Sequence, residues 1–105
     1  MSEPSRKQRI LDMLLDTPDD PELRYMLAME YAGEGNDAEA VRCFEALVAV
    51  DPNYAPAYYM GARTLIRLDR IDEAKAMLER GIPAALAQGN QHAAGEMQEL
   101  LASLE

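Results

Sequence analysis

Apolar side chains recur at spacings of three and four residues along most of the chain, and polar breaks interrupt them at short intervals. That spacing places the apolar residues of each segment on one face of an α-helix. The breaks contain proline, glycine, aspartate or asparagine, and no alternating β-branched pattern competes with the helical one. The pattern predicts an all-α fold whose helices are joined by short turns, so that neighbours in the chain are antiparallel.

Six helices are expected. Ser5 and Asp20 are expected to cap the first two, because their side-chain oxygens can accept the free N–H groups of a first helical turn. A glycine in the break at 33–36 is expected to adopt the left-handed conformation that ends a helix. The fifth helix is expected to continue through Pro83, since its apolar positions keep helical phase on both sides of that residue, and to be kinked there by the loss of an internal hydrogen bond. The predicted bounds are 5–18, 21–32, 37–50, 55–68, 72–87 and 91–104.

Each predicted helix carries an apolar stripe that we expect to be buried. The stripes are Ile10, Leu11, Leu14 and Leu15; Leu23, Leu27, Ala28 and Tyr31; Ala40, Val41, Phe44, Leu47 and Val48; Tyr58, Gly61, Ala62 and Leu65; Ala74, Met77, Leu78, Ile82, Ala85 and Leu86; and Ala94, Met97, Leu100, Leu101 and Leu104.

Part of the chain repeats at one fixed offset. Tyr25 and Tyr59 lie 34 positions apart, and Pro18 and Pro52 keep the same offset. The other pairs at this offset are Met26/Met60, Ala28/Ala62, Glu39/Glu73, Ala40/Ala74 and Glu45/Glu79. A fixed offset of this size is typical of a repeat built from two helices.

The repeating residues resemble the tetratricopeptide repeat family, and in particular its small stand-alone bacterial members. The resemblance is carried by Leu27-Ala28, Tyr31, Ala40, Phe44 and Pro52 in the first unit, and by Tyr58, Gly61-Ala62, Leu65, Ala74 and Leu78 in the second. Arg24 stands where the first unit would have its leading aromatic residue, and Leu86 stands where the second would have its closing proline.

The resemblance implies a right-handed α-α superhelix of antiparallel helix pairs. Residues 1–105 would form a single domain. Its parts would be a half-repeat at 5–18, repeats at 21–54 and 55–88, and a capping helix at 91–104.

In this family the first helix of each pair lines a concave groove that binds peptide segments. The resemblance therefore implies groove positions at Glu22, Tyr25, Met26, Met29, Gly33, Pro56, Tyr59, Met60, Arg63, Ile66 and Arg67. These positions lie off the predicted stripes, so we expect them to face solvent, and exposed tyrosine and methionine are typical of contact surfaces. The alternative interpretation is that the tyrosines and methionines pack against a neighbouring helix.

Arg63 and Arg67 lie one helical turn apart, so together they could bind a carboxylate of the ligand. The lysine, asparagine and arginine clamp of some family members is not expected, because Tyr25 and Met29 stand at its first positions. The predicted partner is a protein segment of mixed apolar and acidic character, bound without catalysis. The alternative function is a self-associating scaffold protein, with exposed helix faces pairing into a homodimer; the expected state is a monomer or a weak homodimer.

The composition changes this picture in one respect, which is the class of partner. The formal net charge is −9, from 19 acidic and 10 basic residues, and this disfavours binding to nucleic-acid backbones or anionic membrane surfaces. The start of the chain has no apolar signal region and no segment is long enough to span a membrane, so a cytoplasmic location is expected. The acidic, lysine-poor composition fits either a high-salt cytoplasm or an arginine-preferring genome.

Candidate chemistry is sparse. His92, Glu96 and Glu99 follow one another on the last predicted helix, but a metal site needs further converging ligands, so we interpret them as polar surface residues. Cys43 is the single cysteine, which excludes an internal disulfide, and we expect it to be a buried apolar residue. We therefore expect no catalytic residue, metal or cofactor, and no enzyme activity.

Overall fold

The computed structural model describes residues 3–105, and in this range the chain forms six helices. They are α1 (Arg6–Asp16), α2 (Pro21–Gly33), α3 (Asp37–Val50), α4 (Ala55–Arg67), α5 (Ile71–Ala87) and α6 (Gln91–Ser103). The described residues contain no strand, so the all-α prediction is confirmed. The helix ends agree with the predicted ones to within two residues, and α5 runs without interruption through Pro83.

The local chemistry at the helix ends is that expected from the sequence. The hydroxyl of Ser5 accepts the backbone N–H of Gln8 at 3.0 Å, and the carboxylate of Asp20 accepts that of Leu23 at 3.2 Å. Each bond satisfies an N–H group that has no partner within its helix. Between α2 and α3, Gly35 has a φ of 79°, a conformation that glycine adopts without the steric penalty of a side chain.

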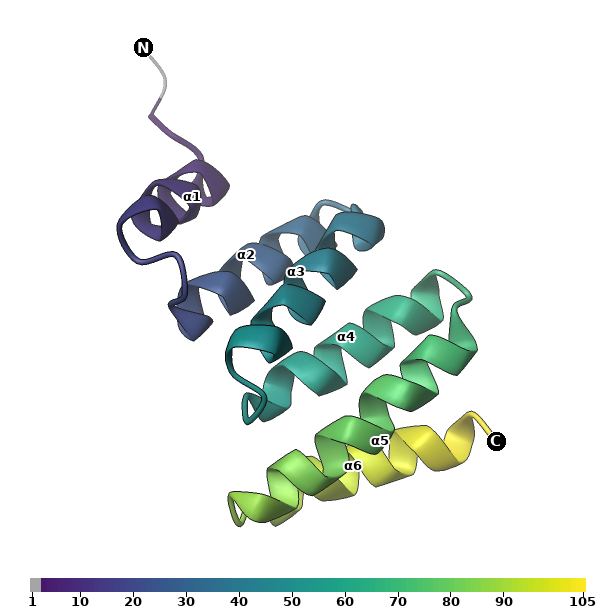
Figure 1. Cartoon of the computed structure of the whole chain (residues 1–105). Coiled ribbons are helices and arrows are strands. Elements are labelled where there is room, and N and C mark those ends of the chain that lie inside the picture. The colour runs from purple at the N-terminus through teal and green to yellow at the C-terminus, as the bar shows by residue number, and fades with distance from the viewer. Residues whose placement is uncertain (1–2) are drawn as a thin grey trace.

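Helices that are neighbours in the chain pack against one another, and the molecule is elongated as a result. Figure 1 shows α1 at one end and α6 at the other, with α2 to α5 following in order between them. The molecule measures 50 × 29 × 19 Å along its principal axes. Helix α6 also contacts α4, the helix two before it in the chain. We therefore group every second helix, α2, α4 and α6, as one layer of the stack.

The core lies where α3, α4 and α5 meet. The predicted stripes of α3 and α4 are buried at every position, as expected for helices with a neighbour on each side. Gly61 allows close packing here, because a Cβ atom in its place would lie 2.8 Å from Cε of Met77 and 3.3 Å from Cβ of Phe44. The absence of a side chain at Gly61 thus allows α4 to pack closely against α3 and α5.

The predicted burial of Leu15 and Leu86 is wrong. Leu15 is 81% exposed because α1 packs chiefly against α2, which covers the face that carries Ile10 and leaves the far side uncovered. Leu86 is 50% exposed because Ala85 occupies the buried position, and the next residue of a helix points about 100° away. Other stripe residues are only half-buried, namely Leu11, Leu14, Leu23, Leu27, Tyr31, Ile82, Leu100, Leu101 and Leu104.

Polar contacts attach α1 to α2 around the buried Ile10. Arg6 forms an ion pair with Glu30 at 2.8 Å, and Lys7 forms one with Glu34 at 3.0 Å. The ammonium group of Lys7 also lies 4.9 Å from the centre of the Tyr31 ring. Ion pairs on a surface contribute little each, so these contacts orient α1 more than they stabilise the fold.

Candidate functional site

Four of the predicted groove residues line one hollow, namely Tyr25, Pro56, Tyr59 and Met60. Tyr25 from α2 and Tyr59 and Met60 from α4 meet there with residues of α6, and the space has a volume of about 320 Å³. We call this the central hollow. Its lining is Tyr25, Ala55, Pro56, Tyr59, Met60, Asn90, His92, Ala93 and Glu96. Helices α2, α4 and α6 therefore contribute to one concave surface although their residues are far apart in the sequence.

A second hollow continues from the central one along α6. It has a volume of about 300 Å³ and is lined by Tyr59, Glu96, Glu99, Leu100 and Ser103. Tyr59 and Glu96 belong to both hollows, so the two spaces adjoin. We call this second space the α6 hollow.

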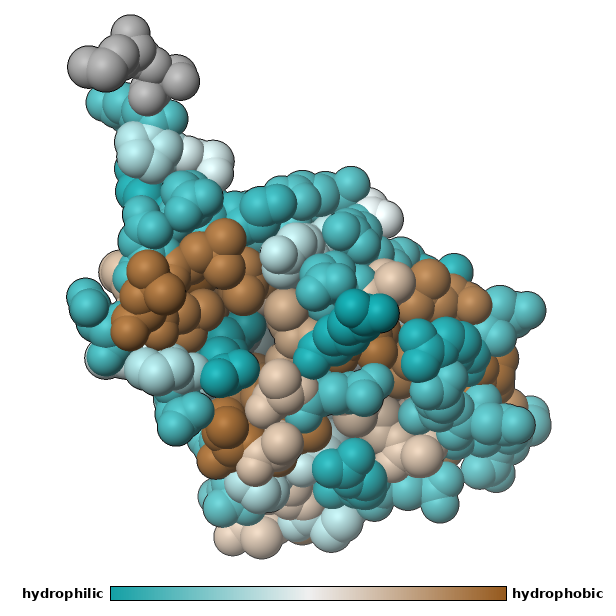
Figure 2. All heavy atoms as spheres, turned by 45° about the horizontal axis from the view of Figure 1, so that its top comes forward, coloured by the Kyte–Doolittle hydropathy of each residue, from teal (hydrophilic) through white to brown (hydrophobic). Residues whose placement is uncertain are grey.

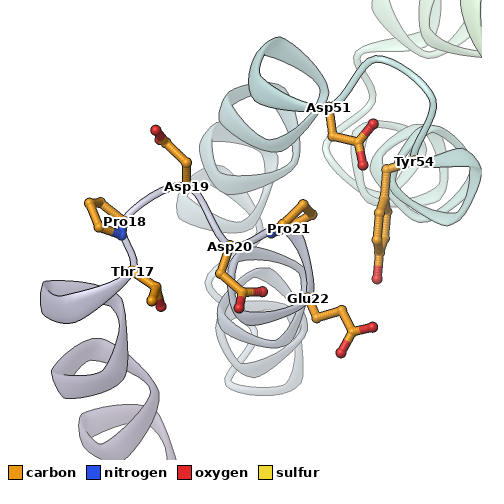
Figure 3. Close-up of a pocket in the computed structure, with 8 residues that line it drawn as sticks. All are labelled: Thr17, Pro18, Asp19, Asp20, Pro21, Glu22, Asp51 and Tyr54. Atoms are coloured by element: carbon orange, nitrogen blue, oxygen red, sulfur yellow. The ribbon is translucent and has the colours of Figure 1, made fainter.

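A third hollow lies where the turn between α1 and α2 meets the turn before α4. It has a volume of about 700 Å³ and is lined by Thr17, Pro18, Asp19, Asp20, Pro21, Glu22, Asp51 and Tyr54. We call it the acidic hollow. Figure 3 shows the side chains of Glu22 and Asp51 extending towards Tyr54, whereas Asp19 points away. Burial raises the pKa of Tyr54, and the negative charge of Glu22 raises it further.

A tyrosine of the acidic hollow contacts a tyrosine of the central hollow. The ring centres of Tyr25 and Tyr54 lie 5.4 Å apart, a contact distance for aromatic side chains. Tyr54 lines the acidic hollow, and Tyr25 lines the central one. We refer to the three hollows together as the groove.

The predicted groove tyrosines lie between the solvent-exposed and the core-packed alternatives. Tyr25 is half-buried, with its ring centre 6.1 Å from that of Phe44, and burial raises its pKa. Tyr59 is also half-buried, and the guanidinium carbon of Arg63 lies 5.7 Å from its ring centre, at cation–π distance. Met26, Met29, Met60 and Ile66 are half-buried, whereas Glu22, Gly33, Pro56, Arg63 and Arg67 are exposed.

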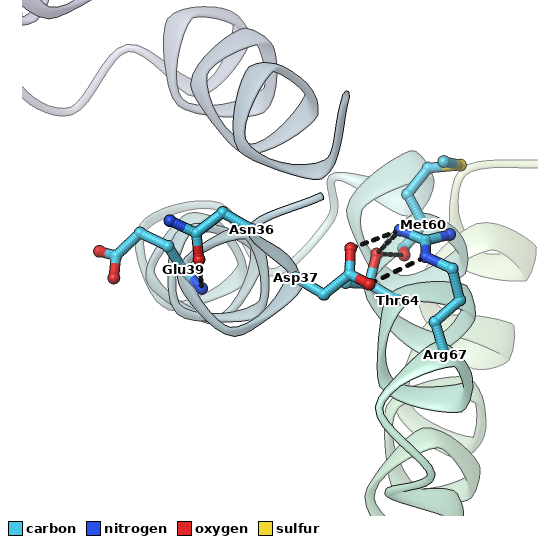
Figure 4. Close-up of polar contacts among 6 residues, drawn as sticks. All are labelled: Asn36, Asp37, Glu39, Met60, Thr64 and Arg67. Carbon is cyan, nitrogen blue, oxygen red and sulfur yellow. Dashed lines mark hydrogen bonds and ion pairs between the residues drawn. The ribbon is translucent and has the colours of Figure 1, made fainter. Parts of the chain in front are cut away.

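The two arginines of the predicted carboxylate site have different surroundings. Arg67 donates two hydrogen bonds to the carboxylate of Asp37 on α3, from Nε to Oδ2 at 3.2 Å and from Nη2 to Oδ1 at 3.0 Å (Figure 4). Arg67 also donates from Nη2 to the hydroxyl of Thr64 at 3.3 Å. Arg63 has no carboxylate within 4.0 Å among residues 3–105. Arg67 is thus engaged within the protein, and the structure does not present the two arginines as one site.

The offset of 34 residues does not reveal the α6 residues of the groove, because the spacing changes before α6. Helix α5 has 17 residues where α3 has 14, so α6 begins 36 positions after α4, at Gln91 after Ala55. An offset of 36 relates His92, Glu96 and Glu99 to Pro56, Met60 and Arg63. These positions of α4 were predicted to face the groove, so extending the repeat with a longer second unit would have found them.

The remaining candidate chemistry is weak. His92 Nε2 lies 3.3 Å from a carboxylate oxygen of Glu96, one turn along α6. Across residues 3–105, no three histidine, cysteine, aspartate or glutamate side chains converge as a metal ion requires. Cys43 is half-buried rather than buried, and burial raises the pKa of its thiol, with a further contribution from Glu39. A raised pKa makes this thiol a poor nucleophile at neutral pH.

Cys43 borders a small hollow of about 230 Å³ between α2 and α3. Its lining is Arg24, Leu27, Glu39, Arg42, Cys43 and Ala46. The Nε atom of Arg24 is buried here without a hydrogen-bond partner. In the second unit, the equivalent position holds Tyr58, which is 3% exposed and donates its hydroxyl to the carbonyl of Pro52 at 2.8 Å. The hollow thus lies where the first unit lacks an aromatic side chain.

The comparisons with known proteins agree with this geometry. The family model described as tetratricopeptide repeat matches residues 31–104. The chain belongs to the tetratricopeptide repeat family. The all-α superhelix of antiparallel helix pairs predicted from the sequence is therefore confirmed as the fold of this family.

Three solved structures resemble the chain over most of its length. A solution structure of a tetratricopeptide repeat domain protein from Salinibacter ruber shares 38% identity with a TM-score of 0.79, over 84% of this chain and 89% of that one. A crystal structure of a tetratricopeptide repeat domain protein from the same organism shares 36% identity with a TM-score of 0.76, over 81% of this chain and 94% of that one. A solution structure of a protein from Bordetella parapertussis shares 27% identity with a TM-score of 0.81, over 97% of this chain and 89% of that one. No match was found among curated proteins.

Membership in the tetratricopeptide repeat family has consequences for function. The fold is a common protein–protein interaction module, and members of the family are generally non-catalytic. None of the helices within residues 3–105 combines the length and the apolar character that crossing a bilayer requires.

Proposed function

We propose that this tetratricopeptide repeat protein binds a peptide segment of another protein in the groove formed by α2, α4 and α6, and that it catalyses no reaction. The observation that carries the proposal is the meeting of Tyr25, Tyr59 and Met60 in the central hollow. The proposal keeps the division into a half-repeat, two repeats and a final helix, with one addition: α6 also forms a wall of the groove.

The half-burial of the two tyrosines supports this proposal. Each ring packs partly against the core and keeps part of its surface available, so a ligand would meet side chains that are already ordered. Ordered aromatic side chains contribute contact area at a low cost in conformational entropy. Met60 lines the same hollow, and its flexible thioether can adapt to different apolar side chains.

The ligand expected from the sequence has apolar and acidic character. The central hollow supports the apolar part, because two tyrosines and a methionine line it. The acidic part depended on Arg63 and Arg67 acting together, and Arg67 is bonded to Asp37. Of the two predicted arginines, Arg63 alone would therefore be available to bind a carboxylate of the ligand.

Selection of peptides on the purified protein tests the proposal. Peptides enriched from a random display library should bind the native chain, and Tyr59→Ala combined with Arg63→Ala should abolish that binding. Arg9→Ala combined with Leu15→Ala is the matched control, because both side chains are exposed on α1, outside the groove. Helical circular dichroism should be unchanged in both variants. Undiminished binding by the Tyr59/Arg63 variant would place the site elsewhere.

A homodimer is the second candidate function, and an exposed apolar surface on α1 favours it. Leu15 is 81% exposed and Met13 is 46% exposed, and Figure 2 shows a hydrophobic patch over this helix. Sedimentation at increasing protein concentration would detect a dimer, and Leu15→Glu should dissociate it. Leu86→Glu is the control, since this leucine is 50% exposed on α5. A monomer at every concentration would exclude this candidate.

A further inference from the structure

We propose that the segment bound in the groove carries basic side chains on both sides of an apolar stretch. Glu22 would receive one basic side chain in the acidic hollow, and Glu96 and Glu99 would receive another in the α6 hollow. This inference rests on the proposed function and specifies the chemical class of its ligand. It reverses the ligand charge that the sequence suggested.

The shape of the groove supports a ligand that spans all three hollows. Tyr54 of the acidic hollow contacts Tyr25 of the central hollow, and the central hollow shares Tyr59 and Glu96 with the α6 hollow. An extended peptide of about eight residues reaches about 27 Å, which compares with the 29 Å middle dimension of the molecule. The middle of the peptide would contact the tyrosines and Met60, which favour apolar groups.

At the α6 end, the available charge is negative. Glu99 has no cationic partner within 4.0 Å in the part of the chain that the structure describes. Glu96 lies near His92, which opposes its charge only when the imidazole is protonated. Both carboxylates line the α6 hollow beside the ring of Tyr59. A lysine or arginine of the ligand could therefore form an ion pair there.

At the other end, the acidic residues have different tasks. Asp20 caps α2, Asp51 accepts the backbone N–H of Asn53 at 3.1 Å, and Asp19 lies 3.6 Å from Arg24. Glu22 is exposed and forms no ion pair with any residue from 3 to 105. It extends towards Tyr54 in the acidic hollow (Figure 3), so the pairing of a free carboxylate with an aromatic ring occurs here too.

The two arginines that the sequence predicted for the groove do not cancel these charges. Arg67 is neutralised by Asp37, and Arg63 lies over the ring of Tyr59. Of this pair, Arg63 alone could therefore oppose the negative charges of Glu22, Glu96 and Glu99. The net charge of −9 adds a long-range attraction for a basic ligand and a repulsion for an acidic one. Both terms therefore favour a basic segment.

Three synthetic peptides of about eight residues, long enough to span about 27 Å, test the inference on the full chain. They share one apolar core of leucine and tyrosine and differ only in their flanking residues, which are lysine, glutamate or serine. The lysine-flanked peptide should bind about ten-fold more tightly than the serine-flanked one at low salt, and this advantage should fall as salt is added. The glutamate-flanked peptide should bind most weakly.

Two charge variants locate the effect. Glu22→Gln with Glu99→Gln should remove most of the ten-fold advantage of the lysine-flanked peptide over the serine-flanked one. Glu45→Gln with Glu79→Gln is the matched control, because it removes the same charge from exposed positions on α3 and α5. If both double variants lose the same amount, the effect comes from overall charge and the inference is overturned.

The remaining outcomes separate this inference from the proposed function. Equal binding of the three peptides, abolished by Tyr59→Ala with Arg63→Ala, would overturn the inference and support the groove as the binding site. Tighter binding of the glutamate-flanked peptide would overturn the inference in favour of an acidic ligand. Binding of no peptide at all would overturn the inference, and failure of library selection as well would overturn the proposed function.

Discussion

The carboxylate of Asp37 on α3 receives two hydrogen bonds from the guanidinium of Arg67 on α4. The pair joins α3 to α4, two helices that follow one another in the chain. Asp37 is 17% exposed and Arg67 is 43% exposed, so the contact is partly shielded from water. A two-point contact of this kind fixes geometry better than a single ion pair does.

We expect this ion pair to stabilise the interface between the repeats. A double-mutant cycle of Asp37→Asn and Arg67→Gln should give a coupling free energy of about 1 kcal/mol in urea unfolding. Glu39 and Arg42 are the control, because they form a single exposed contact at 3.6 Å and should couple by about 0.3 kcal/mol or less. Equal coupling in the two cycles would mean that the contact with Arg67 has no special role.

Gly81 should tolerate no side chain. A Cβ atom there would lie 2.5 Å from Cβ of Tyr58 and 2.6 Å from Sδ of Met97, so Gly81→Ala should lower the free energy of unfolding by about 2 kcal/mol or more. Gly95 is also helical but has nothing within 4 Å of that position, so Gly95→Ala should raise the free energy of unfolding by about 0.5 kcal/mol. Chemical denaturation measures both, and a neutral Gly81→Ala would contradict the packing described.

Arg24 should be replaceable with a gain in stability. Its Nε atom is buried without a hydrogen-bond partner, and its contact with Asp19 is long, at 3.6 Å. Arg24→Met keeps the apolar part of the side chain and removes the unsatisfied donor, so the free energy of unfolding should rise by about 1 kcal/mol. Arg42→Met, at a side chain that is 79% exposed, should change stability by about 0.5 kcal/mol at most. A loss of stability in Arg24→Met would show that the ion pair with Asp19 stabilises the fold by more than the unsatisfied Nε donor destabilises it.

Cys43 should react slowly with thiol reagents. Because its pKa is raised by burial and by Glu39, the folded chain holds less reactive thiolate at pH 8 than the unfolded chain. Alkylation by iodoacetamide should be about ten-fold faster in urea. Glu39→Gln should lower the thiol pKa and accelerate alkylation of the folded chain, and Glu45→Gln, at an exposed position on the same helix, should not. Equal rates in folded and unfolded chains would refute the burial effect.

The same pKa shift predicts how Cys43 affects stability. A thiol whose pKa is higher in the folded chain favours folding while it is protonated, and this contribution is lost as the pH rises through the folded-state pKa. The free energy of unfolding should therefore decline above neutral pH, and Cys43→Ala should reduce that decline. An unchanged decline in Cys43→Ala would attribute the pH dependence to other groups.

The sequence predicts the middle of the fold better than its ends. On α3 and α4 every predicted stripe residue is buried, because each helix has a neighbour on both sides that covers its apolar face. On α1 the same spacing of leucines gives one exposed side chain, Leu15, because a helix at the end of a series has a neighbour on one side. Periodicity shows which residues share a face but not whether another helix covers that face.

The groove was predictable only in part. Tyr25, Tyr59 and Met60 could be placed together because the offset of 34 holds between α2 and α4. The contribution of Glu96 was missed because the extra length of α5 changes the offset to 36. The pairing of Arg67 with Asp37 links residues 30 positions apart and depends on how α3 and α4 are oriented, which no local pattern encodes.

Contacts between successive helices give the chain a graded resistance to opening. Helix α1 can detach by breaking its contacts with α2, whereas α3 and α4 can open only after helices on their flanks have moved. Amide protons of α1 should therefore exchange with solvent earliest and those of α3 and α4 latest. The molecule would unfold stepwise, beginning with its amino-terminal helix and proceeding towards the middle of the stack.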